Sequence, residues 1–497
     1  MKKNSLTIRS VTFAAVAGLS LGIAAPGAIA VAEESILQNL QGDEDDNVKK
    51  ANIDFTKTGS LTLHKKKGAE SEKNATGQQM DNVAGESLNG VKFKITKLDF
   101  DLQNGDWTKF PKTAADAKGH ETGTTKEAVT SGDGTARFQE LELGIYLVEE
   151  TDAPDGIVMG APFIVSIPMV NEASDAWNYN VVAYPKNTET KVEKTVKDAD
   201  KNIQDAYTYT IDADAPTWGK DKELTAFRFE DELDNRLDFQ KVTEVKAGDV
   251  KLGDGDYTVN DPDAEGNKLV VTLTEQGLKK VTSGAKMSLT FDVKRKKVGE
   301  STELKNRADV FFNNPNSDKE VKNKTNEVVT YHGKLKVVKK DGKEEGKVLE
   351  GAEFQLYQCA SAANLGENPL TVNGVDKWTT GADGTFTIDG LHVTDYEDGK
   401  EVAPATKKFC LKETKAPAGY ALPDKNITEI EFTRKNISEK GNFEGDDDVT
   451  LVSEIENIKQ GTPKLPKTGG AGVGILAAIG AAIVAAGAWF ARRGAKN

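Results

Sequence analysis

The sequence is poor in the residues that build metal sites and in aromatic residues. Its 497 residues include only two cysteines and four histidines, and aromatic residues make up 7% of the chain. The scattered cysteines and histidines do not have the spacing of metal ligands, so we expect no metal site and no cofactor. The sequence contains no Ser-His-Asp order and no phosphate-binding loop, so we do not expect an enzyme.

The sequence also lacks a stripe of basic residues. Its formal net charge is −14, and we therefore expect no binding to nucleic acid. A solvated surface is the simplest interpretation of the acidity. The length is that of three or four domains.

The first 32 residues have the pattern of a secretory signal peptide. A positively charged start is followed by an apolar stretch at 11–25 and by small residues at 28–32 that offer a cleavage site. Residues 33–52 are acidic and poor in large apolar groups, which predicts a flexible leader. We therefore expect a secreted protein.

The segment 461–497 has the pattern of a second addressing signal. An apolar run at 471–490 is long enough, at the rise of an α-helix, to cross the hydrocarbon core of a membrane, and basic residues follow it. Alone, this run would also fit a permanent membrane anchor. A pentapeptide directly precedes it: Leu465, Pro466, Lys467, Thr468 and Gly469. The combination resembles a Gram-positive cell-wall sorting signal, which a sortase would cut between Thr468 and Gly469.

One series of four short motifs occurs twice in the same order. In the first copy the motifs are LTLHK at 61–65, LNGVKF at 88–93, DGT at 133–135 and YLVEETDAP at 146–154. In the second copy they are LKVVK at 335–339, LEGAEF at 349–354, DGT at 383–385 and FCLKETKAP at 409–417. We therefore predict two related domains, at 53–187 and 333–460.

A different unit lies between them, at 188–332. Its apolar runs alternate with period two and are separated by Asp, Asn, Gly and Pro, which is typical of β-strands. We therefore expect an all-β chain of three tandem immunoglobulin-like β-sandwiches.

Strand parity predicts that each domain buries a lysine, an acid and an asparagine. Side chains alternate between the two faces of a strand, so the leucines, valines and phenylalanines mark the inward face. The inward lysines are Lys65, Lys194 and Lys339. The inward acids are Glu150, Asp231 and Glu413. The inward asparagines near the domain ends are Asn180, Asn306 and Asn457.

These buried polar groups have two interpretations. A buried charge must be paired or neutral, and a plain buried salt bridge is the interpretation that parity alone favours. The other interpretation uses all three groups. Desolvation lowers the pKa of the lysine and raises that of the acid, so a neutral amine can attack the asparagine side-chain carbonyl while the acid shuttles protons. The product would be an amide cross-link and ammonia.

Several motifs resemble those of Gram-positive pilins. ETDAPDG at 150–156 and ETKAPAGY at 413–420 are similar to the pilin E-box, whose glutamate promotes a Lys–Asn isopeptide bond. LKVVKKD at 335–341 looks like the first strand of CnaB-type pilin domains, although the first domain has Lys67 where the aspartate would be. FEDELDNRL at 229–237 and LKNRADVFFNNP at 304–315 resemble the middle, CnaA-type domain of backbone pilins.

The resemblance implies one isopeptide triad in each domain. The implied triads are Lys65/Glu150/Asn180, Lys194/Asp231/Asn306 and Lys339/Glu413/Asn457. In the first domain the asparagine stays open, because N-terminal domains of the family often lack the bond. In the middle domain Asn326 and Asp238 stay open as alternatives, although Asp238 has the wrong parity.

The segment WNYNVVAYPKN at 177–187 resembles the pilin motif, whose core is Tyr-Pro-Lys. The resemblance implies that Lys186 attacks the sortase-bound Thr468 of the next subunit, which would join identical subunits head to tail. Pro185 ends strand pairing, and Lys186 falls at the boundary between two predicted domains, where it can be exposed. An ordinary solvated linker lysine is the alternative.

Cys359 and Cys410 both stand in the third predicted domain. Export favours oxidation, so we predict one disulfide between them. Parity places Cys410 on the face opposite Glu413, away from the core. Free surface thiols and pairing between subunits are the alternatives.

The motifs together cover essentially the whole chain, which resembles three-domain backbone pilins of the corynebacterial type. The resemblance implies a structural shaft subunit of a covalently polymerised surface pilus that supports adhesion and is anchored to the cell wall. The implied partners are identical pilin subunits, pilus-specific and housekeeping sortases, peptidoglycan, minor pilins and host-cell ligands. A monomeric wall-anchored adhesin or an accessory pilin is the alternative.

Overall fold

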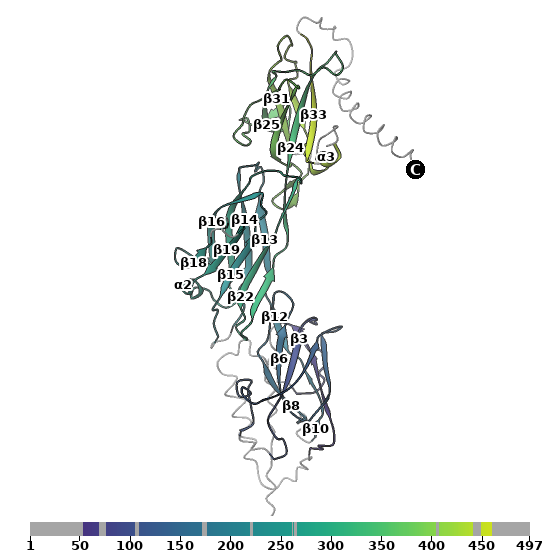
Figure 1. The fold of residues 1–497 in the computed structure, drawn as a ribbon, viewed down its shortest axis with the longest axis vertical. Coiled ribbons are helices and arrows are strands. Elements are labelled where there is room, and N and C mark those ends of the chain that lie inside the picture. The colour runs from purple at the N-terminus through teal and green to yellow at the C-terminus, as the bar shows by residue number, and fades with distance from the viewer. Residues whose placement is uncertain are drawn as a thin grey trace, which may run out of the picture.

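The computed structural model describes residues 53–68, 76–104, 109–170, 176–218, 222–260, 262, 266–403, 407–440 and 449–459. The predicted signal peptide, the leader and the sorting signal with Thr468 lie outside these ranges. The described chain forms β-sandwiches that follow one another along the long axis of the molecule (Figure 1). The predicted all-β fold of tandem sandwiches is therefore confirmed. Within the described ranges, no helix is long and apolar enough to cross a membrane.

The first sandwich contains strands β1 to β12. Their bounds are β1 (Gly59–His64), β2 (Lys66–Lys67), β3 (Lys92–Leu98), β4 (Glu121–Val129), β5 (Thr135–Leu141), β6 (Gly144–Asp152), β7 (Ile157–Val158), β8 (Phe163–Ile167), β9 (Met169–Val170), β10 (Trp177–Asn178), β11 (Asn180–Ala183) and β12 (Lys186–Glu189). One sheet has the order β4-β3-β6-β8 and the other the order β11-β1-β5. The short strands β2-β12-β7 form a third sheet, and β10 pairs with β9.

The second sandwich has two five-stranded sheets, β13-β14-β20-β16-β17 and β18-β19-β15-β22-β23. The bounds are β13 (Val192–Lys197), β14 (Ala206–Asp214), β15 (Phe227–Glu232), β16 (Leu237–Ala247), β17 (Val250–Lys251), β18 (Tyr257–Val259), β19 (Lys268–Leu273), β20 (Lys286–Arg295), β21 (Glu303–Asn306), β22 (Ala308–Asn313) and β23 (Glu320–Lys324). A single helical turn, α2 (Glu275–Leu278), follows β19, and the side chain of Thr274 caps it.

The third sandwich repeats the plan of the first. Its bounds are β24 (Val328–Asp341), β25 (Glu353–Ser361), β26 (Asn364–Leu365), β27 (Trp378–Thr379), β28 (Thr385–His392), β29 (Tyr396–Glu397), β30 (Lys400–Glu401), β31 (Lys408–Lys415), β32 (Ile427–Ile430), α3 (Arg434–Lys440) and β33 (Thr450–Asn457). In the third sandwich β24 lies between antiparallel β28 and parallel β33, as β1 lies between antiparallel β5 and parallel β11 in the first. The repeated motifs therefore mark the same strands in both sandwiches.

Strand β24 crosses from the second sandwich to the third. Its first residues pair with β21 of the second sandwich, and the rest pair with β28 and β33 of the third. The boundary that we predict after residue 332 therefore falls inside one continuous strand, which ties the two sandwiches together.

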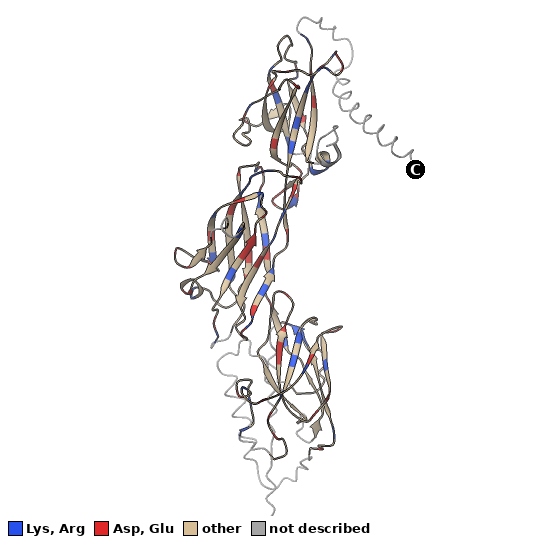
Figure 2. Ribbon diagram, in the orientation of Figure 1, with Lys and Arg blue, Asp and Glu red and all other residues tan. Residues whose placement is uncertain are grey.

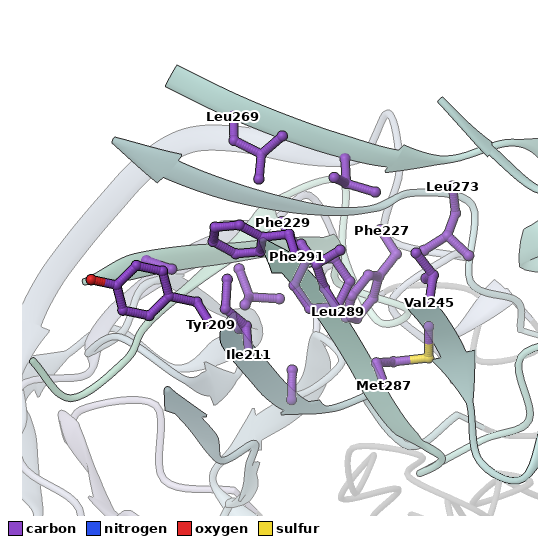
Figure 3. Close-up of a cluster of buried hydrophobic side chains, with 14 of the residues drawn as sticks. Tyr209, Ile211, Phe227, Phe229, Val245, Leu269, Leu273, Met287, Leu289 and Phe291 are labelled. Atoms are coloured by element: carbon purple, nitrogen blue, oxygen red, sulfur yellow. The ribbon is translucent and has the colours of Figure 1, made fainter. Parts of the chain in front are cut away.

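Each sandwich has its own apolar core. Figure 3 shows part of the core of the second sandwich, where side chains from facing sheets meet. Strand β15 contributes Phe227 and Phe229, and β20 contributes Leu289 and Phe291, all at alternate positions. Separate buried clusters fill the first and third sandwiches. This alternation buries whatever stands in the inward set of a strand, including its charged residues.

A disulfide joins Cys359 on β25 to Cys410 on β31, with a Cα–Cα distance of 5.8 Å. The predicted intramolecular bridge is therefore confirmed. Both cysteines are buried, yet neither belongs to the apolar cluster of the third sandwich, in agreement with the parity of Cys410. The bridge fastens neighbouring strands on the side of the sheet that faces away from the core.

Replacing both cysteines with alanine should lower the free energy of unfolding of the third sandwich by about 4 kcal/mol. The chain-entropy model gives this magnitude for a cross-link between residues 51 apart in the sequence. Urea unfolding followed by amide hydrogen exchange in β25 and β31 would measure the change in the third sandwich. An unchanged unfolding midpoint would show that the bridge does not restrain the unfolded chain.

Candidate functional site

The three predicted lysines are buried almost completely. Lys65, Lys194 and Lys339 have exposed fractions of 0%, 1% and 0%. Each stands on or just after the first long strand of its sandwich, at an inward position, and each is the neighbour of an aromatic ring. The Nζ atoms lie 5.7 Å from the centroid of Phe93, 4.6 Å from that of Tyr209 and 5.9 Å from that of Phe354, respectively. All three lysines are therefore buried, as strand parity predicts.

In the third sandwich the lysine, the acid and the asparagine form a closed triangle. Nζ of Lys339 on β24 donates to Oδ1 of Asn457 on β33 at 2.6 Å. Nδ2 of Asn457 donates to Oε1 of Glu413 on β31 at 2.7 Å, and Oε2 of Glu413 lies 3.2 Å from Nζ of Lys339. All three side chains are buried. The amine therefore lies directly beside the amide, and the acid contacts both.

The first sandwich has the same triangle with a different asparagine. Lys65 donates to Oε1 of Glu150, and its Nζ also donates to Oδ1 of Asn187 at 2.6 Å. Nδ2 of Asn187 donates to Oε2 of Glu150 at 2.7 Å. Asn187 is 2% exposed and stands on the short strand β12. The asparagine of this triad is therefore Asn187.

The prediction that Asn180 points into this site is wrong. Asn180 is exposed at the start of β11, where its Oδ1 accepts a hydrogen bond from Oγ of Ser60 at 2.8 Å. Strand β11 ends at Ala183, and after Tyr184 and Pro185 a new strand, β12, begins. It is β12 that pairs with the residues directly after Lys65. The alternation of side chains along β11 therefore does not extend to Asn187, which completes the site from β12.

The register of the third sandwich contains the signal that identifies Asn187. In the third sandwich Asn457 pairs with Asp341, two residues after the triad lysine Lys339. In the first sandwich Asn187 pairs with Lys67, again two residues after the triad lysine. Extending the internal repeat to the last strand of each copy would have aligned the two asparagines.

In the second sandwich Lys194 on β13 contacts Oδ2 of Asp231 on β15, and both side chains are fully buried. Asn306 at the end of β21 is 3% exposed and lies close enough to affect Asp231 electrostatically. Within the described part of the chain, neither amide atom of Asn306 has a hydrogen-bond partner, and Oδ1 of Asp231 has none either. Asn306 is therefore buried near Asp231, but its side-chain amide forms no hydrogen bond among the described residues.

The two alternatives in the second sandwich lie elsewhere. Asn326 is exposed, and its side chain bonds the backbone of Lys194, accepting from its N at 2.8 Å and donating to its O at 3.0 Å. Asp238 is half-buried and accepts from the side chain of Gln240 at 2.8 Å. The geometry therefore favours Asn306 and Asp231.

Burial shifts the pKa values of Lys194, Asp231 and Lys339 toward the neutral forms of these side chains. Desolvation lowers the pKa of Lys194 below its usual value, although the charge of Asp231 opposes the shift. Desolvation raises the pKa of Asp231 above its usual value. Burial likewise lowers the pKa of Lys339, against the opposing charge of Glu413. A neutral amine next to a neutral acid is the state that nucleophilic attack on an amide requires.

Lys186 stands on the other face of β12 from Asn187. It is half-buried and follows Pro185, and its backbone pairs with Lys66 of β2 in parallel register. Just before it, the ring of Tyr184 stacks on His64 with a centroid distance of 5.2 Å. Within the described ranges, Nζ of Lys186 has no ion pair or hydrogen bond. Adjacent residues of β12 thus lie on opposite faces, with Asn187 in the buried triad and Lys186 half-buried on the other side.

Ion pairs elsewhere lie mostly on the strand surfaces, where both signs of charge are interspersed along all three sandwiches (Figure 2). Most of them join neighbouring strands, such as Lys92 with Glu127 at 2.7 Å. Among the described residues there is no group of three or more His, Cys, Asp or Glu side chains that could hold a metal ion. The buried triads are therefore the sites with distinctive chemistry.

Three protein families match successive parts of the chain. The family described as Gram-positive pilin subunit D1, N-terminal domain, matches residues 56–188. The Sgo0707 N2 domain family matches residues 185–324, and the prealbumin-like fold domain family matches residues 333–446.

Known proteins are similar over most of the chain. The fimbrial subunit type 2 of Actinomyces naeslundii is 30% identical, over 94% of this chain and 95% of that protein. The fimbrial subunit type 1 of Actinomyces viscosus is 31% identical, over 88% of this chain and 90% of that protein. The solved structure of the full-length major pilin SpaD from Corynebacterium diphtheriae is 81% identical, with a TM-score of 0.76, and covers 82% of this chain and 99% of that one.

Proposed function

The chain belongs to the Gram-positive pilins, the subunits of surface fimbriae, and we propose that sortase joins its copies head to tail through Lys186 and Thr468 to form the pilus shaft. The observation that carries this proposal is the placement of Lys186. It begins the short strand β12, between β2 and β7, at the junction of the first and second sandwiches, with no ion pair or hydrogen bond of its amine within the described residues. A sortase-bound threonine can be presented there without unfolding either sandwich.

A head-to-tail polymer needs an amine on one subunit and an activated carbonyl at the C-terminal end of the next. Lys186 supplies the amine, and the predicted sorting signal supplies Thr468 as a thioester on the sortase. Aminolysis joins Nζ to the threonine carbonyl carbon and releases the sortase thiol. A housekeeping sortase would transfer the last threonine to peptidoglycan, which anchors the pilus to the cell wall. Minor pilins and host-cell ligands would complete the assembly and its role in adhesion.

We further propose that each triad closes an intramolecular isopeptide bond. Nζ of the lysine attacks Cγ of the asparagine, the Cγ–Nδ2 bond breaks, and Nδ2 leaves as ammonia after the acid relays a proton from the amine to it. The triangle of Lys339, Asn457 and Glu413 supports this pathway, because the acid already bonds the leaving nitrogen at 2.7 Å. The reaction removes the formal charges from the core, and each triad reacts once, on its own chain.

Asn187→Ala should abolish the loss of one ammonia from the first sandwich, whereas Asn180→Ala should leave it intact. Of these two asparagines, Asn187 lies at hydrogen-bond distance from Lys65, whereas Asn180 bonds Ser60. Intact-mass measurement of the two variants, with the disulfide reduced, would read out the difference directly. Retention of the full ammonia loss in Asn187→Ala would contradict the assignment, as would its disappearance in Asn180→Ala.

A monomeric wall-anchored adhesin is the competing function, because it would share the sandwiches, the triads and the sorting signal. It would not need a reactive lysine at Lys186. A ladder of covalent multimers on a denaturing gel of wall extracts would separate the two functions, since an adhesin would give a single band.

A further inference from the structure

The junction between the second and third sandwiches is centred on two buried histidines. His332 lies on β24 where the strand passes between the sandwiches, and His392 ends β28. The two residues pair in the ladder, and both are almost fully buried. Their rings meet edge to face, with centroids 5.1 Å apart and planes at 90°. A charge on one ring is therefore felt strongly by the other.

The contacts of His332 require a neutral ring. Nδ1 lies 3.1 Å from Nη1 of Arg295, which can only donate, so Nδ1 must accept. Nε2 lies 2.8 Å from the backbone carbonyl of Lys201, so Nε2 must carry the proton. The remaining guanidinium contacts of Arg295 go to carbonyl oxygens, and Arg236 lies behind it, paired with Asp234 at 2.9 Å. A second proton on His332 would sit on Nδ1, which faces the donor Nη1 of Arg295 and not an acceptor.

The contacts of His392 suit a charged ring. Nε2 lies 3.0 Å from Oδ2 of Asp198, and Nδ1 lies 2.8 Å from the backbone carbonyl of Val393. Both partners only accept, so both hydrogen bonds form only if each ring nitrogen carries a proton. Asp198 comes from the second sandwich, and its Oδ1 accepts from the backbone N of Asp398 in the third at 2.8 Å. The pair therefore fastens one sandwich to the other.

We propose that His332 and His392, with Arg295 and Asp198, form an acid-releasable clasp that fixes the orientation of the second and third sandwiches at neutral pH. Protonation of His332 would break its bond to Arg295 and place a cation 3.1 Å from the guanidinium. The new charge would also lie against the ring of His392, which contacts the buried carboxylate of Asp198. The rim pairs, Lys197 with Asp398 and Lys407 with Asp200, are exposed enough to be screened by solvent.

The direction of the pH response follows from His332. Burial, the charge of Arg295 and His392 hold the pKa of His332 well below its usual value. A base with a lowered folded-state pKa contributes its full stability above its unfolded value of about 6.5 and loses that stability as the pH falls through the folded-state value. The clasp should therefore hold at neutral pH and weaken progressively as the pH falls below about 6.5 toward the folded-state pKa of His332.

The junction between the first and second sandwiches provides an internal contrast. There, Nδ2 of Asn323 donates to the backbone carbonyl of Thr190 at 2.6 Å, and Nδ2 of Asn314 donates to that of Met159 at 3.1 Å. Amides do not titrate in this range, so acid should leave these contacts in place.

The test combines a distance measurement with a neutral replacement of His332. Fluorophores on cysteines introduced at the exposed Val250 and Val375 would report the distance between the second and third sandwiches. In the otherwise unchanged mature chain, we expect a narrow distance distribution at about pH 7.5 that broadens at about pH 4.5. His332→Gln should abolish the broadening, because a glutamine amide can accept from Arg295 and donate to the Lys201 carbonyl without titrating. The matched control, His120→Gln at an exposed histidine, should broaden like the parent chain.

Nitrogen NMR of the wild-type rings gives a second readout that needs no folded variant. The chain has only four histidines, so their side-chain signals can be separated. At neutral pH we expect His332 to show one protonated nitrogen, Nε2. A distance distribution that does not respond to acid, a response that persists in His332→Gln, or a doubly protonated His332 at neutral pH would each overturn the proposal.

Discussion

Cells that express Lys186→Arg should attach single subunits to the wall and should lose the ladder of covalent multimers completely. A guanidinium stays protonated under the conditions of assembly, so it cannot attack the sortase-bound carbonyl of Thr468. The substitution keeps the positive charge and most of the side-chain length. Lys186 is half-buried with no described partner, so folding and the internal triads should be unaffected. Denaturing gels of wall extracts would measure the loss.

Lys66→Arg is the matched control for this variant. Lys66 lies opposite Lys186 in the parallel pairing of β2 with β12, and Nζ of Lys66 donates to Oγ of Ser87 at 3.1 Å. We expect the ladder to persist in this control, because the reacting amine is intact. A full ladder in Lys186→Arg would show that another lysine is the nucleophile. Loss of the ladder in Lys66→Arg would show instead that sortase docking depends on the paired strands β2 and β12.

The buried lysines and acids could be predicted from the sequence because strand parity is a local property. Lys339 and Glu413 each follow inward apolar residues along one unbroken strand, so a period of two suffices to place them. The same holds for Lys194 and Asp231, and the structure brings both pairs together. The disulfide followed from the presence of only two cysteines in one exported domain.

The asparagine of the first sandwich could not be predicted in this way because it depends on pairing between distant segments. Asn187 reaches Lys65 across 122 residues of sequence, on a strand that begins anew after Pro185. Parity does not carry across such an interruption, whereas the register of a parallel pair does. The choice of Asn306 over Asn326 was likewise a matter of three-dimensional placement, since both stand near the end of the second sandwich.

The histidine clasp was also beyond sequence reasoning. His332 and His392 are 60 residues apart, and the four histidines of the chain carry no spacing that would single out this pair. Their contacts depend on how two sandwiches meet around β24, which the predicted boundary after residue 332 treated as a break. The hydrophobic pattern of each domain predicts its own strands and core, but it does not predict which surfaces of two domains come into contact.

Glu413→Gln should leave the isopeptide bond of the third sandwich unformed and lower the stability of that sandwich by about 5 kcal/mol. The chain-entropy model gives this magnitude for a cross-link between residues 118 apart, and an uncross-linked Lys339 would remain in the core. Glutamine has nearly the volume of glutamate and can still bond Asn457, but it cannot relay the proton from the amine to the leaving nitrogen. The intact mass should therefore exceed that of the wild-type chain by close to one ammonia, while the first and second sandwiches keep their losses.

Thermal unfolding separates the missing bond from a general packing defect. The third sandwich should melt earlier in Glu413→Gln, and the wild-type chain should stay cross-linked even when unfolded. Glu454→Gln is the matched control, because Glu454 is exposed on the same strand as Asn457 and pairs only with Lys340 among the described residues. We expect this control to lose its ammonia and to melt like the wild type. An ammonia loss from the third sandwich that persists in Glu413→Gln would mean that Lys339 and Asn457 react without the acid, and the triad would then reduce to a buried pair that burial alone activates.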